Sequence, residues 1–330
     1  MKEAEVIERR YFERVKWDIF RLIIGMHALA VVGLFFPSYE GIWLAIVLWF
    51  ITGFGVTVGY HRYFTHNSFT TRYPWVRRLL ANAGLLAGEG DVIGWVARHK
   101  DHHAHSDTPE DPHSPLFGGW WFGPMYSHVG WIVDDKNPKL KLAGKALTED
   151  PYLRRLRKTY ALRHWLLIGV LALSGLLFGY FVRNDAFLLW RWERVFLSPA
   201  WSAAYYAASF TGYGYFVRIV FVLNATWAVN SLSHMYGGQP YKTEAGDNSR
   251  ENLLVAIVAH GEGWHNAHHA SPSSYRHGQA WWKFDLSACV IECMAWCGLV
   301  DDLQPFEPSV RKIAGAVPKG RREEKEEAEP

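Results

Sequence analysis

Apolar and polar positions in this chain fall into long blocks instead of short repeats. Four apolar blocks are each close to the roughly 17 to 25 residues with which a helix crosses a bilayer. They occupy residues 20–37, 41–60, 161–181 and 215–233. The second block contains no charged residue at all. The pattern therefore predicts an all-α membrane protein with four transmembrane helices.

Polar stretches at 61–160 and 234–310 alternate with these blocks and are too rich in charge to lie in lipid. The first carries 14 Lys and Arg, whereas the segment 182–214, which we expect to be a loop, carries three. Basic loops stay in the cytoplasm, so both termini and both polar regions are predicted to be cytoplasmic. A shorter apolar patch at 79–96 is interrupted by charge at Glu89 and Asp91, which favours a surface-lying or re-entrant helix.

Composition adds two points. The 17 Trp, 16 Tyr and 19 Phe fit the aromatic belts of a membrane protein. The net charge of +3 comes without a basic stripe, so no nucleic-acid partner is expected. We expect a single domain over residues 1–310, with a charged amphipathic segment at 1–19 and a solvated, disordered tail at 311–330.

Histidines gather in three short motifs. The pattern H-x-x-H-H occurs twice, and a further pair stands in H-R-Y-F-T-H. Spacings of three and four residues place imidazoles on one side of a helix. A further histidine ends the fourth apolar block in N-S-L-S-H, with Asn230 one turn before it. The set is His61, His66, His99, His102, His103, His234, His265, His268 and His269.

All of these histidines fall on the predicted cytoplasmic side, which indicates one metal centre built from distant segments. They are more than a tetrahedral zinc site needs, so two metals are the simpler interpretation. Iron, zinc and copper all accept neutral imidazole. Two E-x-x-H motifs, at Glu262 and Glu110, suggest a carboxylate-bridged site instead. Pro112 lies inside the second motif and no Glu pair occurs in the spans, which favours the all-histidine site.

The order of the motifs H-R-Y-F-T-H, H-K-D-H-H, N-S-L-S-H and G-E-G-W-H-N-A-H-H resembles the integral-membrane fatty acid desaturases of the acyl-CoA Δ9 type, over about residues 52–299. The segments S-H-V-G-W and S-R-E-N resemble the same family. The resemblance implies four spans and a cytoplasmic helical di-iron domain that introduces a cis double bond, at Δ9, using O2 and two electrons. It places the ligands of two iron ions on the nine histidines above, with Asn230 bound through water.

A substrate tunnel is expected beneath these ligands. Thr57, Gly53 and Trp49 lie about one, two and three helical turns below His61, so this face is expected to line it. Candidate contacts for a phosphorylated carrier are Arg98, Lys100, Lys136 and Lys139.

Two acidic residues, Asp134 and Asp135, follow S-H-V-G-W, where acyl-CoA members of the family carry basic ones. The carrier therefore stays open between CoA, a lipid and a carrier protein.

Electrons must come from a separate protein, because the chain has no heme-binding H-P-G-G segment and no cysteine cluster. The resemblance implies a ferredoxin, rubredoxin or cytochrome b5 type donor with its NAD(P)H reductase. Carboxylates are candidates to orient the ligand rings: Asp101, Asp107, Glu262 and Asp285. His105 and His260 are expected to be neighbours of the site and not ligands.

Two other functions remain open at this stage. A hydroxylase or ketolase would use the same histidine motifs. A non-catalytic metal-binding membrane protein is the other alternative. The position of every motif outside the spans, and the lack of intramembrane carboxylates, argue against an ion path.

Overall fold

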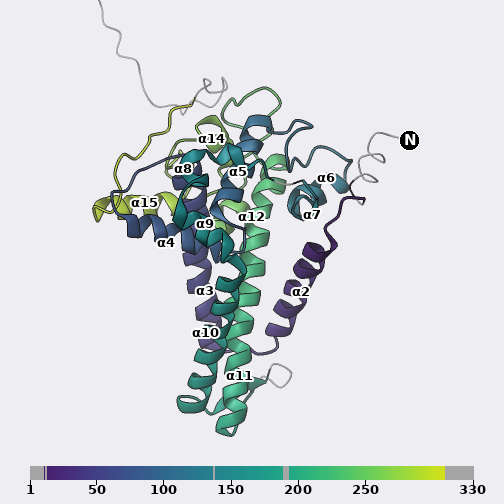
Figure 1. The fold of residues 1–330 in the computed structure, drawn as a ribbon, viewed down its shortest axis with the longest axis vertical. Coiled ribbons are helices and arrows are strands. Elements are labelled where there is room, and N and C mark those ends of the chain that lie inside the picture. The colour runs from purple at the N-terminus through teal and green to yellow at the C-terminus, as the bar shows by residue number, and fades with distance from the viewer. Residues whose placement is uncertain (1–10, 12, 137, 189–192, 309–330) are drawn as a thin grey trace, which may run out of the picture.

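The computed structural model describes residues 11, 13–136, 138–188 and 193–308. The expected tail at 311–330 and most of the expected N-terminal segment lie outside the described residues. Helices dominate, and they form a narrow stem below a broader head (Figure 1). We call the three longest helical runs the stem, and residues 66–158 and 236–308 the head.

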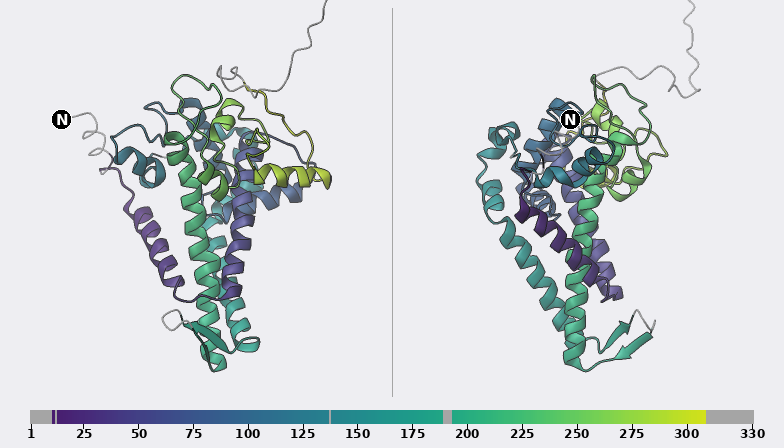
Figure 2. Two further views of the ribbon diagram at one scale, coloured as in Figure 1. Left: turned by 180° about the vertical axis from the view of Figure 1, so that it is seen from behind. Right: turned by 90° about the vertical axis from the view of Figure 1, so that its right-hand side faces the viewer.

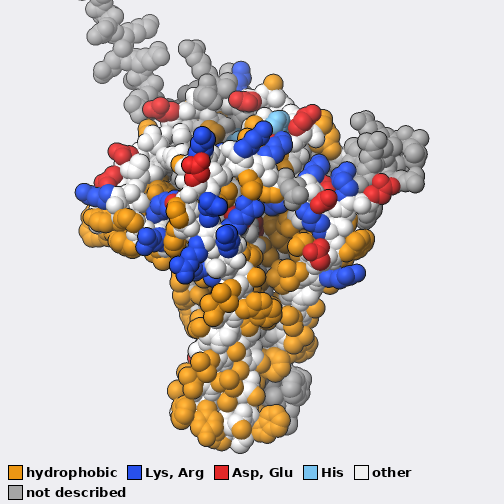
Figure 3. All heavy atoms as spheres, in the orientation of Figure 1, with side chains coloured by type: hydrophobic (Ala, Val, Ile, Leu, Met, Phe, Trp, Pro, Cys, Tyr) orange, Lys and Arg blue, Asp and Glu red, His pale blue; other side chains and the backbone are white. Residues whose placement is uncertain are grey.

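Three helical runs are long and apolar enough to cross a membrane. The first, Tyr39–Thr65, joins α3 (Tyr39–Phe54) to the π-helix η1 (Gly55–Thr65). The second is α10 (Tyr160–Phe181). The third, Pro199–Met235, joins α11 (Pro199–Thr211), the π-helix η4 (Gly212–Val217) and α12 (Arg218–Met235). Hydrophobic side chains cover the stem, whereas Lys, Arg, Asp and Glu gather on the head (Figure 3).

The segment 182–214 is not the loop that we predicted. It contains the antiparallel hairpin of β1 (Asp185–Leu188) and β2 (Glu193–Phe196), followed by α11. Pro199 starts this helix, as proline suits a first helical turn. The last stem helix therefore begins at Pro199 and not at residue 215. Its aromatic residues Tyr206 and Phe210 pack against Phe178 of α10.

The predicted first span is helical but short. α2 runs over Trp17–Gly33, 17 residues, and ends before the predicted boundary at residue 37. Figure 2 shows α2 slanting away from α12 towards the head. Its lower end meets η4, where a Cβ on Gly33 would come within 2.8 Å of the Gly212 Cα.

Two glycines let α10 and α11 pack closely. A Cβ added to Gly175 would lie 2.3 Å from the Tyr206 carbonyl oxygen, and one on Gly179 would lie 2.4 Å from that of Ser202. This is the small-xxx-small spacing that allows membrane helices to approach. Gly169, on the same helix, has nothing within 4 Å of its Cβ position.

We predict that Gly175→Val destabilises the protein by about 1–3 kcal/mol, because the added side chain must push α11 away. Gly169→Val is the matched control and should leave the midpoint of thermal unfolding in detergent unchanged. Equal midpoints for the two variants would refute this account of the packing.

The head surrounds the end of η1 with short helices. They are α4 (Pro74–Leu85), α5 (Val92–His105), α6 (Phe122–Met125), η2 (Tyr126–Gly130), α7 (Trp131–Val133), η3 (Leu140–Ala143), α8 (Lys145–Thr148), α9 (Pro151–Lys158), α13 (Leu253–Val258), α14 (His265–Ala270) and α15 (Leu286–Trp296). The patch at 79–96 forms the end of α4, a turn and the start of α5, so it is not one continuous span. A core of buried apolar residues, including Tyr60, Leu85 and Val96, fixes η1 against α4 and α5.

Candidate metal centre

The structure brings all nine predicted histidines together from four parts of the chain. η1 and its end carry His61 and His66, and α5 carries His99, His102 and His103. α12 carries His234, and α14 carries His265, His268 and His269. Their ligand atoms form two groups, each within 4.8 Å: His61, His66, His99, His103 and His268 in the first group, and His102, His234, His265 and His269 in the second.

The π-helix η1 explains why the pair in H-R-Y-F-T-H belongs together. His61 and His66 are five residues apart, a spacing that an α-helix would not align. The backbone N–H of His66 donates to the His61 carbonyl over 3.2 Å, one π-helical turn. The two ring centroids are 4.9 Å apart as a result. A π-helical turn at a functional site is a recurrent feature of proteins.

Within each group the imidazole Nε2 atoms converge. In the first, His268 Nε2 lies 3.0 Å from that of His61 and 2.9 Å from that of His103. In the second, His265 Nε2 lies 3.1 Å from those of His234 and His269. Unprotonated nitrogens this close repel one another unless a cation lies between them.

Burial favours the neutral form of several of these rings, in both groups. It lowers the pKa of His99 and His103 well below the ordinary value, and neighbouring imidazoles lower it further. The same holds for His265 and His268. A neutral imidazole is the form that binds a metal. Both groups therefore present unprotonated nitrogens in a buried space.

Carboxylates hold the opposite nitrogen of four rings. The Nδ1 of His61 lies 2.7 Å from Glu262 Oε2, and that of His234 lies 2.7 Å from Asp107 Oδ2. Asp111 and Asp247 do the same for His102 and His269, at 3.0 and 2.9 Å. At His102, His234 and His269 the carboxylate accepts the Nδ1–H, which leaves the Nε2 lone pair facing the group centre, as around protein-bound metals.

Two of the four predicted orienting carboxylates do not touch the groups. Asp101 pairs with His105 and Lys139. Asp285 accepts from the buried Arg62 and caps α15 through the backbone N–H of Ala288. The sequence motifs place these carboxylates near the histidines along the chain, but the side chains point elsewhere.

Asp111 and Asp247, which do hold rings of the second group, were missed. Both lie in segments rich in Pro, Gly, Ser and Asn, which read as surface turns. Burial alone would raise the pKa of Asp247, but the nearby His269 ring lowers it below the ordinary value. No local sequence signal distinguishes these two carboxylates from ordinary turn residues.

Arg62, between the two histidines of H-R-Y-F-T-H, was also missed and lies behind the first group. It is fully buried and donates to Glu262 at 3.2 Å and to Asp285 at 3.1 Å. It thereby fixes the carboxylate that holds His61. Its neighbour His277 lies 3.3 Å from the same Glu262 through Nδ1.

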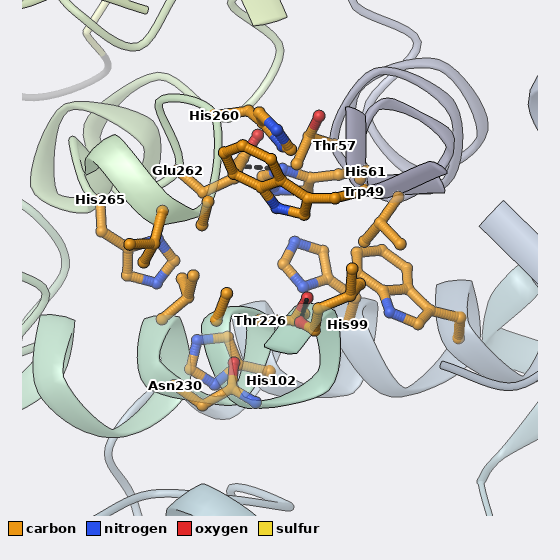
Figure 4. Close-up of a pocket in the computed structure, with 18 residues that line it drawn as sticks. Trp49, Thr57, His61, His99, His102, Thr226, Asn230, His260, Glu262 and His265 are labelled. Atoms are coloured by element: carbon orange, nitrogen blue, oxygen red, sulfur yellow. Dashed lines mark hydrogen bonds and ion pairs between the residues drawn. The ribbon is translucent and has the colours of Figure 1, made fainter. Parts of the chain in front are cut away.

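A largely apolar cavity adjoins both groups (Figure 4). The three predicted tunnel residues on α3 and η1, Trp49, Gly53 and Thr57, all line it, as does Asn230. Sequence reasoning missed the contributions of other elements to this cavity, among them Trp95, Val222, Ala225, Thr226 and His260.

Arg98 is not among the residues that line this cavity. Its guanidinium lies over the Trp131 ring, 5.1 Å from the centroid. The acidic pair beyond S-H-V-G-W is also partnered: Arg14 donates to the buried Asp134 over 3.1 Å, and Lys16 lies 3.5 Å from Asp135.

Comparison with known proteins identifies relatives of this chain. The sequence model of the fatty acid desaturase family matches residues 41–287. The chain is 34% identical to a probable chloroplastic lipid desaturase of Arabidopsis thaliana, over 92% of this chain and 76% of that protein. It is 35% identical to an acyl-CoA 5-desaturase of Anemone leveillei, over 90% and 83%. It is 34% identical to an sn-1 stearoyl-lipid 9-desaturase of Anabaena variabilis, over 88% and 94%. The chain therefore belongs to the fatty acid desaturase family and is an enzyme of the oxidoreductase class.

Proposed function

We propose that this enzyme introduces a cis double bond at the Δ9 position of a saturated fatty acyl chain carried by a lipid or by CoA. One observation supports it above the others: two groups of converging histidines adjoin a largely apolar cavity. The Δ9 position follows the likeness to the stearoyl-lipid 9-desaturase, although another relative is a 5-desaturase.

The donor set suits two iron ions. His61, His66, His99, His103 and His268 would hold one. His102, His234, His265 and His269 would hold the other, with Asn230 acting through water. His102 Nε2 is buried and has no hydrogen-bond partner among the described residues, as expected of an atom reserved for a metal. When bound, the irons would activate O2, using two electrons from a separate donor protein. This activation makes it possible to remove two hydrogens from unactivated methylenes.

The protein's own residues position the chain and keep water away. Trp95, Val222 and Ala225 provide apolar walls beside the histidines. An acyl chain confined there presents only a few methylenes to the metal centre, so regioselectivity follows from geometry. Arg62 donates to Glu262 and so holds this carboxylate against the His61 ring.

Membrane placement follows from the stem. We infer that α2 joins the three candidate spanning helices as a fourth membrane element, with the head and both termini in the cytoplasm. The basic loop 61–160 supports this orientation. A second, more polar cavity, lined by His66, His103 and His269, offers a separate electron donor an approach to both groups.

Expression in a host that lacks unsaturated fatty acids, followed by mapping of double bonds in total lipids, tests the proposal. We expect monounsaturated chains with the bond at Δ9. A hydroxylase or ketolase would instead yield chains that have gained an oxygen. Saturated chains alone, from protein that is folded and iron-loaded, would overturn the proposal.

Trp49 is expected to limit the depth of the cavity. Its ring lies against Phe221, with centroids 5.5 Å apart, and Trp49 lines the cavity about three helical turns before His61 on the run Tyr39–Thr65. Trp49→Ala should therefore let longer acyl chains react. Trp43→Ala, on the same helix but 64% exposed, is the matched control. An unchanged chain-length profile of products in Trp49→Ala would refute this role.

A further inference from the structure

His260 lies in the wall of the acyl cavity. The residue precedes α14, and its side chain is only 2% exposed. It lines the cavity together with Thr57 and His61, as Figure 4 shows. It belongs to neither histidine group. Its position therefore calls for a role other than metal binding.

Aromatic residues of α3 hold the His260 ring in place. Its centroid lies 4.8 Å from that of Trp49, 5.5 Å from Phe50 and 4.7 Å from Phe54. Its Nε2 is buried and makes no hydrogen bond to any described residue. Packing, and not polar contact, therefore fixes the ring.

Gly53 provides the surface on which this ring rests. A Cβ added to Gly53 would lie 2.2 Å from His260 Cε1 and 2.6 Å from its Nδ1. No real Cβ tolerates such distances, so the ring would have to move. The imidazole fills the space that a side chain at position 53 would otherwise occupy.

The backbone leaves His260 little freedom to adjust. Its φ is +54°, a left-handed conformation that is uncommon for a residue other than glycine. The Ser287 backbone N–H donates to its carbonyl over 3.0 Å, which ties it to the start of α15. Burial lowers the pKa of His260 to about 4, so the ring is neutral at neutral pH and compatible with a hydrocarbon neighbour.

We propose that His260 and Gly53 act as a pair that sets the width of the acyl cavity beside the metal centre, which makes His260 a specificity-determining positioning residue. This inference rests on the proposed function. Gly53 leaves space on α3, and the His260 ring, from the loop before α14, fills that space. Changing either one alone alters the space for the chain, and changing both compensates.

A double-variant experiment tests the pairing by mapping of products in cells. His260→Ala should widen the cavity and add new chain lengths or double-bond positions to the products. Gly53→Ala should push the ring into the cavity and lower conversion about tenfold, since small misplacements are costly in such sites. Gly53→Ala combined with His260→Ala should recover most of that loss. Gly25→Ala, with nothing within 4 Å of its Cβ position, is the control.

His260→Phe separates size from polarity. Phenylalanine keeps an aromatic ring of similar size, so the product profile should match that of the wild type. The proposal is overturned if the double variant is no better than Gly53→Ala, if His260→Ala leaves the profile unchanged, or if His260→Phe shifts it as far as His260→Ala.

Thermal unfolding of the same purified variants gives a readout that does not need catalysis. Gly53→Ala should lower the midpoint, and adding His260→Ala should recover it. A wild type that forms no double bond would refute the proposed function alone. The unfolding data would still decide whether residues 53 and 260 are coupled, and independent effects would overturn the pairing.

Discussion

Replacing His268 by alanine is expected to lower desaturation by more than about 100-fold, beyond the loss typical of residues that only orient metal ligands. His268 stands between other rings of the first group, with Nε2 atoms of His61 and His103 at 3.0 and 2.9 Å. Its removal takes one buried nitrogen donor from a group of five histidines. The measurement is product per unit of membrane-inserted protein, by gas chromatography of total fatty acids.

His105→Ala is the matched control for this variant. His105 lies at the end of α5, beside the proposed ligand histidines, but it bonds to Asp101 and belongs to neither group. It should retain nearly full activity. A His268→Ala enzyme with more than about a tenth of wild-type activity would contradict the assignment of His268 as a ligand.

Asp247→Asn is expected to lower activity by about 10- to 100-fold. The Asp247 carboxylate lies 2.9 Å from His269 Nδ1 and also accepts the backbone N–H of Ser249. A neutral amide accepts less strongly and can turn its NH2 group towards the ring, which disturbs the tautomer and orientation of His269. Titration of the purified apoprotein with iron should show a matching loss of affinity.

Two further measurements distinguish the loss of ring orientation from a general destabilisation of the protein. Asp302→Asn, at an exposed carboxylate that bonds to Thr70, should change neither activity nor affinity. Excess iron should partly restore Asp247→Asn but not His268→Ala. Equal, unrescued loss in both variants would show that Asp247 does more than orient His269.

The histidine set could be predicted from the sequence because its motifs are local. Spacings of three and four residues on α5 and α14 need only a helix to bring the rings to one side. How the nine divide into two groups could not be predicted. His102 and His103 are adjacent in sequence but belong to different groups, since successive helical residues point in different directions.

The rest of the site depends on tertiary contacts without a local pattern. Asp111 and Asp247 reach the rings from turns, and His260 reaches the cavity from the loop before α14. The π-helix η1 also has no distinguishing sequence pattern, because hydrophobic periodicity over one or two turns does not distinguish a π-helix from an α-helix. The long apolar helices were also predicted only in part. Block 41–60 was evident because it lacks charge, whereas the aromatic and small residues of 199–211 resembled a surface loop and proved to be helical.

The metal content of the purified, unmodified protein tests the two-iron centre most directly. Elemental analysis of protein prepared without added metal should give two irons per chain at full loading. The iron content per chain should fall in His268→Ala and stay unchanged in His105→Ala. One zinc per chain with no iron, in protein that retains its fold, would contradict the account and favour a structural metal site.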